Sequence, residues 1–156
     1  MKRFENQIEK ALFIALTAHS GQVDKAGKPY ILHPLTVAMM QNTEEEFIAG
    51  LLHDVVEDSD VTLEYLEEQG FSNEILEAVR LLTHEEGEDY LEYVKKIRGN
   101  KIATRVKIAD LKHNSDLGRF SEVTEKDILR LERKYKPAYH ILTGRAWGVN
   151  YGKINR

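Results

Sequence analysis

The 156-residue sequence contains no cysteine. Disulfide bonds, thiolate metal ligands and a cysteine nucleophile are therefore excluded, and the composition suits a reducing compartment. A long apolar run is also missing, because no stretch approaches the roughly 20 residues of a membrane span. The start, MKRFENQIEK, has charged residues but lacks the apolar segment of a secretory signal. These absences predict a cytoplasmic protein without a membrane partner.

Proline is rare, and the net charge is not positive. Only three prolines occur, and the formal net charge is −4, so nucleic acid is not an expected partner. A chain of this length suits one domain and buries roughly 68–70% of its unfolded surface. No segment alternates strongly enough between apolar and polar residues to predict a sheet. The predicted fold class is therefore all-α, a single compact helical bundle.

Apolar residues recur at helical spacing along most of the chain, beginning with IEKALFIALTAH (8–19). The glycines, proline and lysines of GQVDKAGKPY (21–30) predict a loop. Pro34 predicts the start of the next helix, because proline suits the first helical position. Ser72 and Thr124 are predicted N-caps. The remaining helices are predicted over residues 44–58, 62–69, 72–83, 86–99, 100–117 and 125–143, followed by a C-terminal tail over 143–156.

The predicted helix over 44–58 carries ionisable residues beside its apolar face. On a helical wheel of about 100° per residue, Asp58 falls inside the apolar arc and Asp54 at its edge. His53 and Glu57 fall outside that arc. An unpaired buried carboxylate costs several kcal/mol, so an inward-pointing acid needs a cation or a hydrogen-bond donor.

The predicted helix over 100–117 shows the same feature more sharply. Asp110 falls in the middle of the apolar arc, and Asn114 lies beside it. A third polar residue, His33, precedes Pro34, and proline biases the residue before it toward an extended conformation. The sequence therefore predicts His33 in extended backbone at a helix entrance.

Two histidines and two aspartates from three separate segments form a candidate ligand set for one divalent metal: His33, His53, Asp54 and Asp110. Mixed imidazole and carboxylate ligands suit manganese, iron or zinc better than calcium. Each residue alone has an ordinary explanation, since Asp110 can pair with Lys107 and His33 can be a turn residue. Their joint occurrence on three segments favours the metal.

Three stretches resemble successive motifs of a known family: HSGQVDKAGKPYILHPLTVA, AGLLHDVVEDSDVT and VKIADLKHNSDL. Their order and spacing are similar to those of the HD-superfamily alarmone hydrolase domain of Rel/SpoT stringent-response enzymes and of stand-alone small alarmone hydrolases. The resemblance runs over 11–117 and more weakly to residue 142. It implies an HD-type helical domain over 1–142. It also implies the stand-alone form of the hydrolase, because the residues that follow leave no room for a synthetase domain.

The resemblance also implies an activity, the metal-dependent removal of the 3′-pyrophosphate of guanosine tetra- or pentaphosphate. The metal would be a single divalent ion, usually Mn²⁺, and the partner a small-molecule nucleotide. The implied metal ligands are His33, His53, Asp54 and Asp110; Glu57 and Asp58 match the pair that orients and deprotonates water; Lys25 and Asn114 match substrate contacts. Lys28 in the same loop and Tyr135 in RKYK (133–136) are further candidate substrate contacts.

Two positions depart from the family pattern. Asp24 stands where the phosphate loop usually has an arginine, and Asp116 stands where HNMR would place another. An acid cannot stack on a base as a guanidinium does. The alternatives are therefore an adenosine alarmone, another nucleotide or NADPH phosphatase, or a non-catalytic nucleotide-binding module. A homo-oligomer is also left open, with Trp147 and Tyr151 of the tail as one contact between copies.

Overall fold

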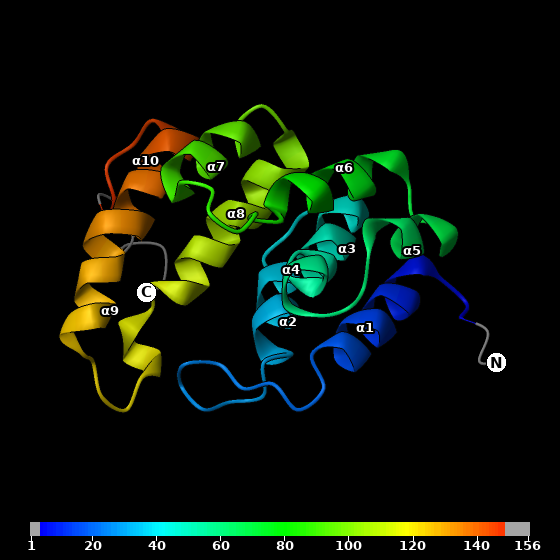
Figure 1. Ribbon diagram of the computed structural model, residues 1–156, viewed down its shortest axis with the longest axis horizontal. Helices are drawn as coiled ribbons and strands as arrows, with labels where there is room; N and C mark the ends of the chain where they lie inside the picture. The colour runs from blue at the N-terminus through cyan, green and yellow to red at the C-terminus, as the bar shows by residue number, and fades with distance from the viewer. Residues whose placement is uncertain (1–3, 149–156) are drawn as a thin grey trace.

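The computed structural model describes residues 4–148, which form a bundle of helices (Figure 1). Within that range, strand-like pairing is limited to an isolated bridge between Val23 and Pro29, so the all-α prediction is confirmed. In chain order the elements are α1 (Gln7–Ala18), α2 (Leu32–Met39), α3 (Glu44–Leu52), α4 (Val55–Asp58), α5 (Leu63–Glu68), α6 (Asn73–Leu82), α7 (Tyr90–Ile97), α8 (Lys101–Asn114), the 3-10 turn η1 (Leu117–Arg119), α9 (Glu125–Arg130), the π-helical turn η2 (Leu131–Tyr135) and α10 (Lys136–Thr143).

The helix starts follow from capping side chains. Ser72 accepts a hydrogen bond from the Ile75 N–H at the start of α6, as predicted. Thr124 accepts from the Asp127 N–H, and the Asp127 side chain bonds back to the Thr124 N–H, which completes a capping box at α9. Both N-cap predictions are therefore confirmed.

The prediction of His33 in extended backbone is wrong. Helix α2 begins at Leu32, so His33 is already helical and Pro34 is the third helical residue. The first N–H groups of a helix have no intrahelical partner, so a proline at this position removes no helical hydrogen bond. The N–H of His33 donates instead to the carbonyl of Tyr30, at 2.9 Å. His33 is thus held in the first turn of a helix.

The prediction of one helix over 44–58 is also wrong, because α3 and α4 are separated by His53 and Asp54. The ring of His53 bonds the carbonyl of Gly50 through Nδ1, at 2.6 Å, and competes with the backbone for that acceptor. The interruption turns the following residues. His53 is only 2% exposed and Asp58 reaches the surface. The helical wheel predicts the opposite, with Asp58 inside the apolar arc and His53 outside it.

The last predicted helix, over 125–143, contains an irregularity. Its middle is the π-helical turn η2, in which the Lys136 N–H bonds the carbonyl of Leu131, five residues back. Pro137 follows at the start of α10 and has no N–H to donate. The extra residue of the turn places Tyr135 in the interior, where it is 8% exposed.

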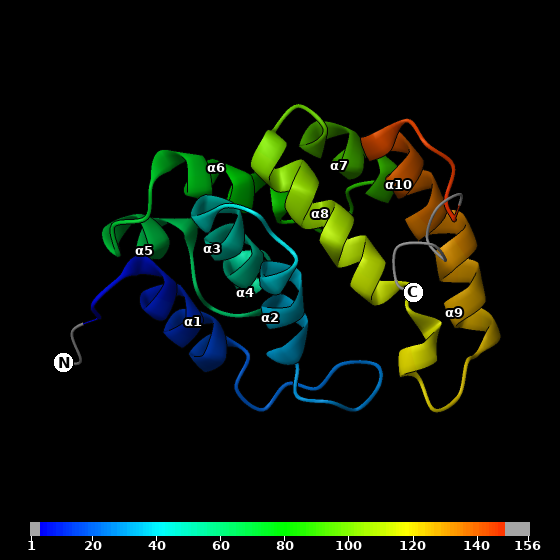
Figure 2. The same cartoon turned by 180° about the vertical axis from the view of Figure 1, so that it is seen from behind.

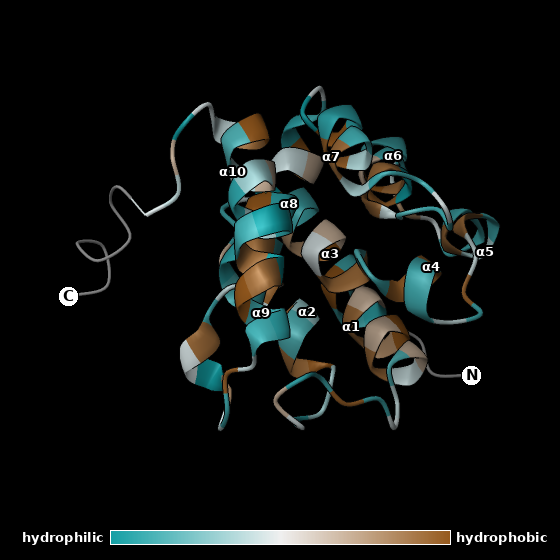
Figure 3. Cartoon of the chain, turned by 60° about the vertical axis from the view of Figure 1, so that its left-hand side comes forward, coloured by the Kyte–Doolittle hydropathy of each residue, from teal (hydrophilic) through white to brown (hydrophobic). Residues whose placement is uncertain are grey.

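The interior consists of two apolar clusters. The first cluster contains residues of α1 and α5, and the second contains residues of α7, α8 and α10. Helices α2, α3 and α6 contribute residues to both clusters. The two groups of helices occupy opposite sides of the molecule in Figure 1 and again in Figure 2. Helices α6 and α7 each carry hydrophilic and hydrophobic segments in Figure 3, and their buried residues recur every three to four positions, the pattern of helices with one buried face.

Helices α2 and α3 pack unusually closely. A Cβ atom added to Gly50 would lie 2.9 Å from the Cα atom of Ala38, so only glycine allows this approach. The contact fixes the position of α2 relative to the end of α3, where His53 follows. Of the helices that residues 4–148 form, none has both the length and the apolar character that a bilayer crossing requires.

Candidate metal centre

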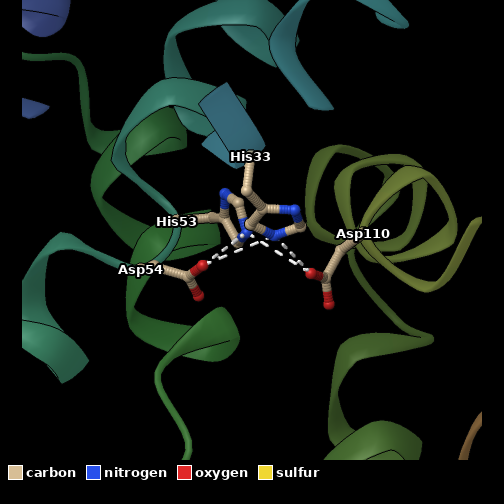
Figure 4. Close-up of side chains that lie close together, drawn as sticks. All are labelled: His33, His53, Asp54 and Asp110. Atoms are coloured by element: carbon tan, nitrogen blue, oxygen red, sulfur yellow. Dashed lines mark hydrogen bonds and ion pairs between the residues drawn. The ribbon is translucent and has the colours of Figure 1, made fainter. Parts of the chain in front are cut away.

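Four side chains from three parts of the fold converge on one point (Figure 4). His33 comes from α2, His53 and Asp54 from the break between α3 and α4, and Asp110 from α8. One nitrogen or oxygen atom of each lies within 4.8 Å of the others. The Nε2 atom of His33 is 2.9 Å from Oδ1 of Asp110, and Nε2 of His53 is 3.0 Å from Oδ2 of Asp54. Donors that share an ion at about 2.0–2.2 Å lie about 3 Å apart, so this spacing suits one cation.

The hydrogen bonding of His53 also supports a cation at this point. Its Nδ1 atom faces the carbonyl of Gly50, which only accepts, so Nδ1 carries a proton. Its Nε2 atom is buried without a hydrogen-bond partner. In the neutral ring Nε2 presents a lone pair to the oxygens of Asp54 and Asp110, at 3.0 and 3.6 Å. A cation between them removes the repulsion, so the residues fit a divalent metal.

The charges of the centre are strongly coupled. Burial lowers the pKa of His53, but the carboxylates of Asp54 and Asp110 outweigh it and raise that pKa well above its usual value. Burial raises the pKa of Asp54, but the charge of His53 outweighs it and lowers that pKa to about 2. Without a metal, a proton on His53 therefore offsets part of the charge of the two acids, and a metal ion would take its place.

Asp110 is held by two neighbours on its own helix. Its Oδ2 atom accepts from Nζ of Lys107 at 2.8 Å, while Oδ1 accepts from Nδ2 of Asn114 at 2.8 Å. Lys107 is itself buried, with its Nζ 5.4 and 5.2 Å from the ring centres of Tyr90 and Tyr93. The pairing of Asp110 with Lys107 and its place in the centre are thus compatible, because each uses a different carboxylate oxygen.

Asp54 has a further partner, Tyr30, which lies 24 residues away and which local sequence patterns do not predict. The hydroxyl of Tyr30 donates to its Oδ2 atom at 2.5 Å. Burial raises the pKa of Tyr30, and the Asp54 charge raises it further, so the phenol remains a donor. This bond links the loop before α2 to the metal centre.

Glu57 and Asp58, the predicted catalytic pair, lie beside the centre on α4. With Asp54 they form a second acidic group whose oxygens lie within 4.8 Å of one another. Partial burial raises the pKa of Glu57, the charges of Asp54 and Asp58 add to that, and a hydrogen bond from the His84 N–H at 2.7 Å opposes it. Partial burial also raises the pKa of Asp58, followed by the charge of Asp54. A carboxylate with a raised pKa is a better proton acceptor for water.

The predicted substrate residues of the loop behave differently from each other. Partial burial lowers the pKa of Lys25, and the nearby charges of Arg130 and Lys134 lower it further, while Asp127 opposes them. Lys25 thus joins a group of cations with helix α9 and the turn after it. Lys28 is exposed, as Lys25 is, and it contacts the loop through its backbone N–H, which donates to Asp24.

Tyr135 lies in the second apolar cluster rather than on an exposed helix face. Burial raises its pKa to about 12, and the charge of Asp110 adds to that rise. Trp147, one of the two tail residues considered for a contact between copies, packs against Tyr139 of its own chain, with ring centres 5.2 Å apart. Tyr151, the other, lies outside the described residues.

The acid at position 24 has a local partner. Asp24 accepts hydrogen bonds from the backbone N–H groups of Ala26 and Lys28, which fold the loop. Its other oxygen pairs with Nη2 of Arg119 at 2.9 Å, and Nη1 of Arg119 donates to the carbonyl of His113 at 2.7 Å. The loop acid is therefore neutralised by an arginine that follows α8.

The chain is similar to known proteins. Residues 11–108 match the family model described as HD domain. The chain is 31% identical over 150 residues to a guanosine-3′,5′-bis(diphosphate) 3′-pyrophosphohydrolase of Aquifex aeolicus, covering 87% of this chain and 21% of the relative. It is 40% identical over 82 residues to the bifunctional (p)ppGpp synthase/hydrolase SpoT of Escherichia coli, covering 48% of this chain and 12% of the relative. The chain thus spans about a fifth or less of these relatives.

A solved structure described as a metazoan ortholog of SpoT that hydrolyzes ppGpp has the same fold. The TM-score is 0.76 over 94% of this chain and 91% of that one, at 23% sequence identity. The predicted HD-type helical bundle is therefore confirmed.

Proposed function

The chain belongs to the HD domain family, and on that basis we propose that it hydrolyses the 3′-pyrophosphate of ppGpp, pppGpp or a closely similar alarmone, releasing pyrophosphate. The observation that carries this proposal is the convergence of two histidines and two aspartates beside the Glu57–Asp58 pair. The substrate class is supported by the names of relatives that match up to 87% of the chain.

In the proposed enzyme His33, His53, Asp54 and Asp110 hold one divalent ion, for which we propose Mn²⁺. Such an ion, when bound, lowers the pKa of water and polarises a phosphoryl oxygen. The protein holds the ligands in place before the ion arrives. Lys107 and Asn114 hold Asp110, the Gly50 carbonyl holds His53, and Tyr30 holds Asp54.

Glu57 is proposed to accept the proton of the attacking water, with Asp58 orienting that water. The His84 N–H holds Oε1 of Glu57, which leaves Oε2 as the proton acceptor. The raised pKa values of both acids suit this role, because they bring proton affinity closer to neutral pH.

Lys25, Arg130 and Lys134 are proposed to neutralise the phosphate groups, because their charges already gather at one place. Asn114, Lys28 and Tyr135 remain proposed contacts to the nucleotide. Among them Asn114 lies nearest to the ligands, since its amide donates to Asp110.

The test is a product assay. Purified protein is incubated with ppGpp and Mn²⁺, and the expected products are GDP and pyrophosphate, with loss of turnover in chelator and in Asp54→Ala. A panel of pppGpp, adenosine counterparts and NADPH, with products resolved by mass, fixes the base and the leaving group. Orthophosphate instead of pyrophosphate would identify a phosphatase. Binding without product across the panel would identify a non-catalytic nucleotide-binding module.

A further inference from the structure

His113, in the last turn of α8, contacts one of the proposed metal ligands. Its Nδ1 atom lies 2.7 Å from Nδ1 of His33. The rings are within 19° of parallel, yet their centres are 4.9 Å apart. Because the nitrogens are much closer than the ring centres, the rings meet edge to edge, which is the geometry of a hydrogen bond between the two nitrogens.

A hydrogen bond between these nitrogens needs a proton on one of them. Which nitrogen carries that proton determines whether His33 can bind a metal. If His113 donates, a neutral His33 carries its own proton on Nε2, where it points at Oδ1 of Asp110, 2.9 Å away. If His33 donates from Nδ1, its Nε2 keeps a free lone pair directed into the centre. Only the second arrangement provides a metal ligand.

We propose that His113 is a positioning residue, which accepts the Nδ1 proton of His33 and thereby fixes the ring orientation and the tautomer that bind the metal. Asp110 and His113 lie one turn apart on α8, so a single helix holds both nitrogens of the His33 ring. The carbonyl of His113 is in turn held by Nη1 of Arg119, which fixes the end of that helix.

His53 shows the same arrangement with a different acceptor. Its Nδ1 atom faces the carbonyl of Gly50 at 2.6 Å, and its Nε2 atom faces the carboxylates. Both histidines of the centre therefore have Nδ1 engaged outside the centre and Nε2 directed into it. An acceptor on the distal nitrogen of a ligating histidine is a general way to fix its tautomer.

The experiment compares His113→Leu, which removes the acceptor, with His113→Asn, whose side-chain oxygen can replace Nδ1. His140→Leu on α10, an exposed histidine, is the matched control. Mn²⁺ affinity, measured by electron paramagnetic resonance, is expected to fall about 10–100-fold in His113→Leu and to stay near the wild-type value in the other two. Wild-type affinity in a folded His113→Leu variant overturns the proposal.

A second measurement covers the case in which His113→Leu does not fold. In the Zn²⁺-loaded protein, ¹H–¹⁵N spectra are expected to show a slowly exchanging Nδ1–H signal of His33 in wild type and His113→Asn, and its loss in His113→Leu. The absence of that signal in wild type overturns the proposal. The inference rests on the proposed metal site, and because no nucleotide enters either measurement, failure to hydrolyse ppGpp leaves its outcome unchanged.

Discussion

Asp24 and Arg119, which are 95 residues apart in the chain, form an ion pair with 2.9 Å between Oδ2 and Nη2. Their side chains are 9% and 20% exposed, so water screens the pair only in part. The pair joins the loop that carries Lys25 to the turn after α8, and Arg119 also holds the carbonyl of His113. The loop that is proposed to bind phosphate is thus anchored to the helix that supplies Asp110.

We expect Arg119→Met to destabilise the protein by about 1–3 kcal/mol, because two charge-assisted hydrogen bonds are lost and Asp24 keeps a partly buried charge. The measurement is the free energy of unfolding in urea. Arg80→Met is the matched control, since Arg80 pairs with Glu77 on the exposed face of α6. That variant should lose less than about 0.5 kcal/mol. Equal losses of unfolding free energy in the two variants would show that the Asp24–Arg119 pair stabilises the protein no more than an exposed pair does.

Mn²⁺ affinity should rise with pH. The pKa of His53 is raised well above its usual value in the metal-free protein, and below that pKa the ring holds a proton that must leave before Nε2 binds the ion. Affinity is therefore expected to increase by up to about tenfold per pH unit, until the pH passes that pKa. Titrations at several pH values in two buffers of different ionisation enthalpy measure the proton released. Affinity independent of pH would contradict the protonated state of His53.

Glu57→Gln should separate chemistry from metal binding. The amide oxygen can still accept from the His84 N–H, so local structure is kept, but the proton acceptor is lost. Turnover is expected to fall about 10²–10⁴-fold with Mn²⁺ affinity preserved. Glu74→Gln, an exposed acid in the first turn of α6, is the control. Undiminished turnover in Glu57→Gln would assign the proton acceptor to another group.

Gly50→Ala should destabilise the protein by about 1–3 kcal/mol, because the added methyl group would meet the backbone of Ala38 at 2.9 Å. Thermal and urea unfolding measure the loss. Gly99→Ala provides the control, since a Cβ atom there would meet nothing within 4 Å. A change within about 0.5 kcal/mol is expected at that position. Wild-type stability of Gly50→Ala would mean that α2 and α3 can separate freely.

The two loop lysines should differ in their effect on substrate. Lys25→Met is expected to raise KM for ppGpp about tenfold or more, because one cation of the group with Arg130 and Lys134 is removed. Lys28→Met should change KM by less than about threefold, since Lys28 contacts the loop through its backbone N–H, which the substitution keeps. Steady-state kinetics at constant ionic strength decide. The opposite ranking would place the phosphates at the other end of the loop.

The sequence is sufficient for most of the helices and for two of the converging residues, Asp54 and Asp110, because apolar periodicity and inward-pointing acids are local signals. It is insufficient for the direction of individual side chains around His53. That break arises from a ring-to-carbonyl bond, which a helical wheel does not contain.

The supporting residues were missed for another reason. Tyr30, His113 and Arg119 act on residues that are 24, 80 and 95 positions away, so only the fold brings them together. Lys107 lies three residues from Asp110, so helical spacing predicts their ion pair but not its place beside a metal centre. Asp116 also has a local structural role, because its side chain accepts from the Gly118 N–H at the start of η1.

The centre lies where the two apolar clusters meet, since His53 and Asp54 follow α3 while Asp110 belongs to α8. An ion bound there would add a link between the two clusters, which already share helices α2, α3 and α6. Its binding free energy would then add to the cooperativity of unfolding as a whole. Removal of the ion by a chelator would then speed the exchange of amide hydrogens in the segments that carry the ligands, which are the end of α3, the start of α2 and α8.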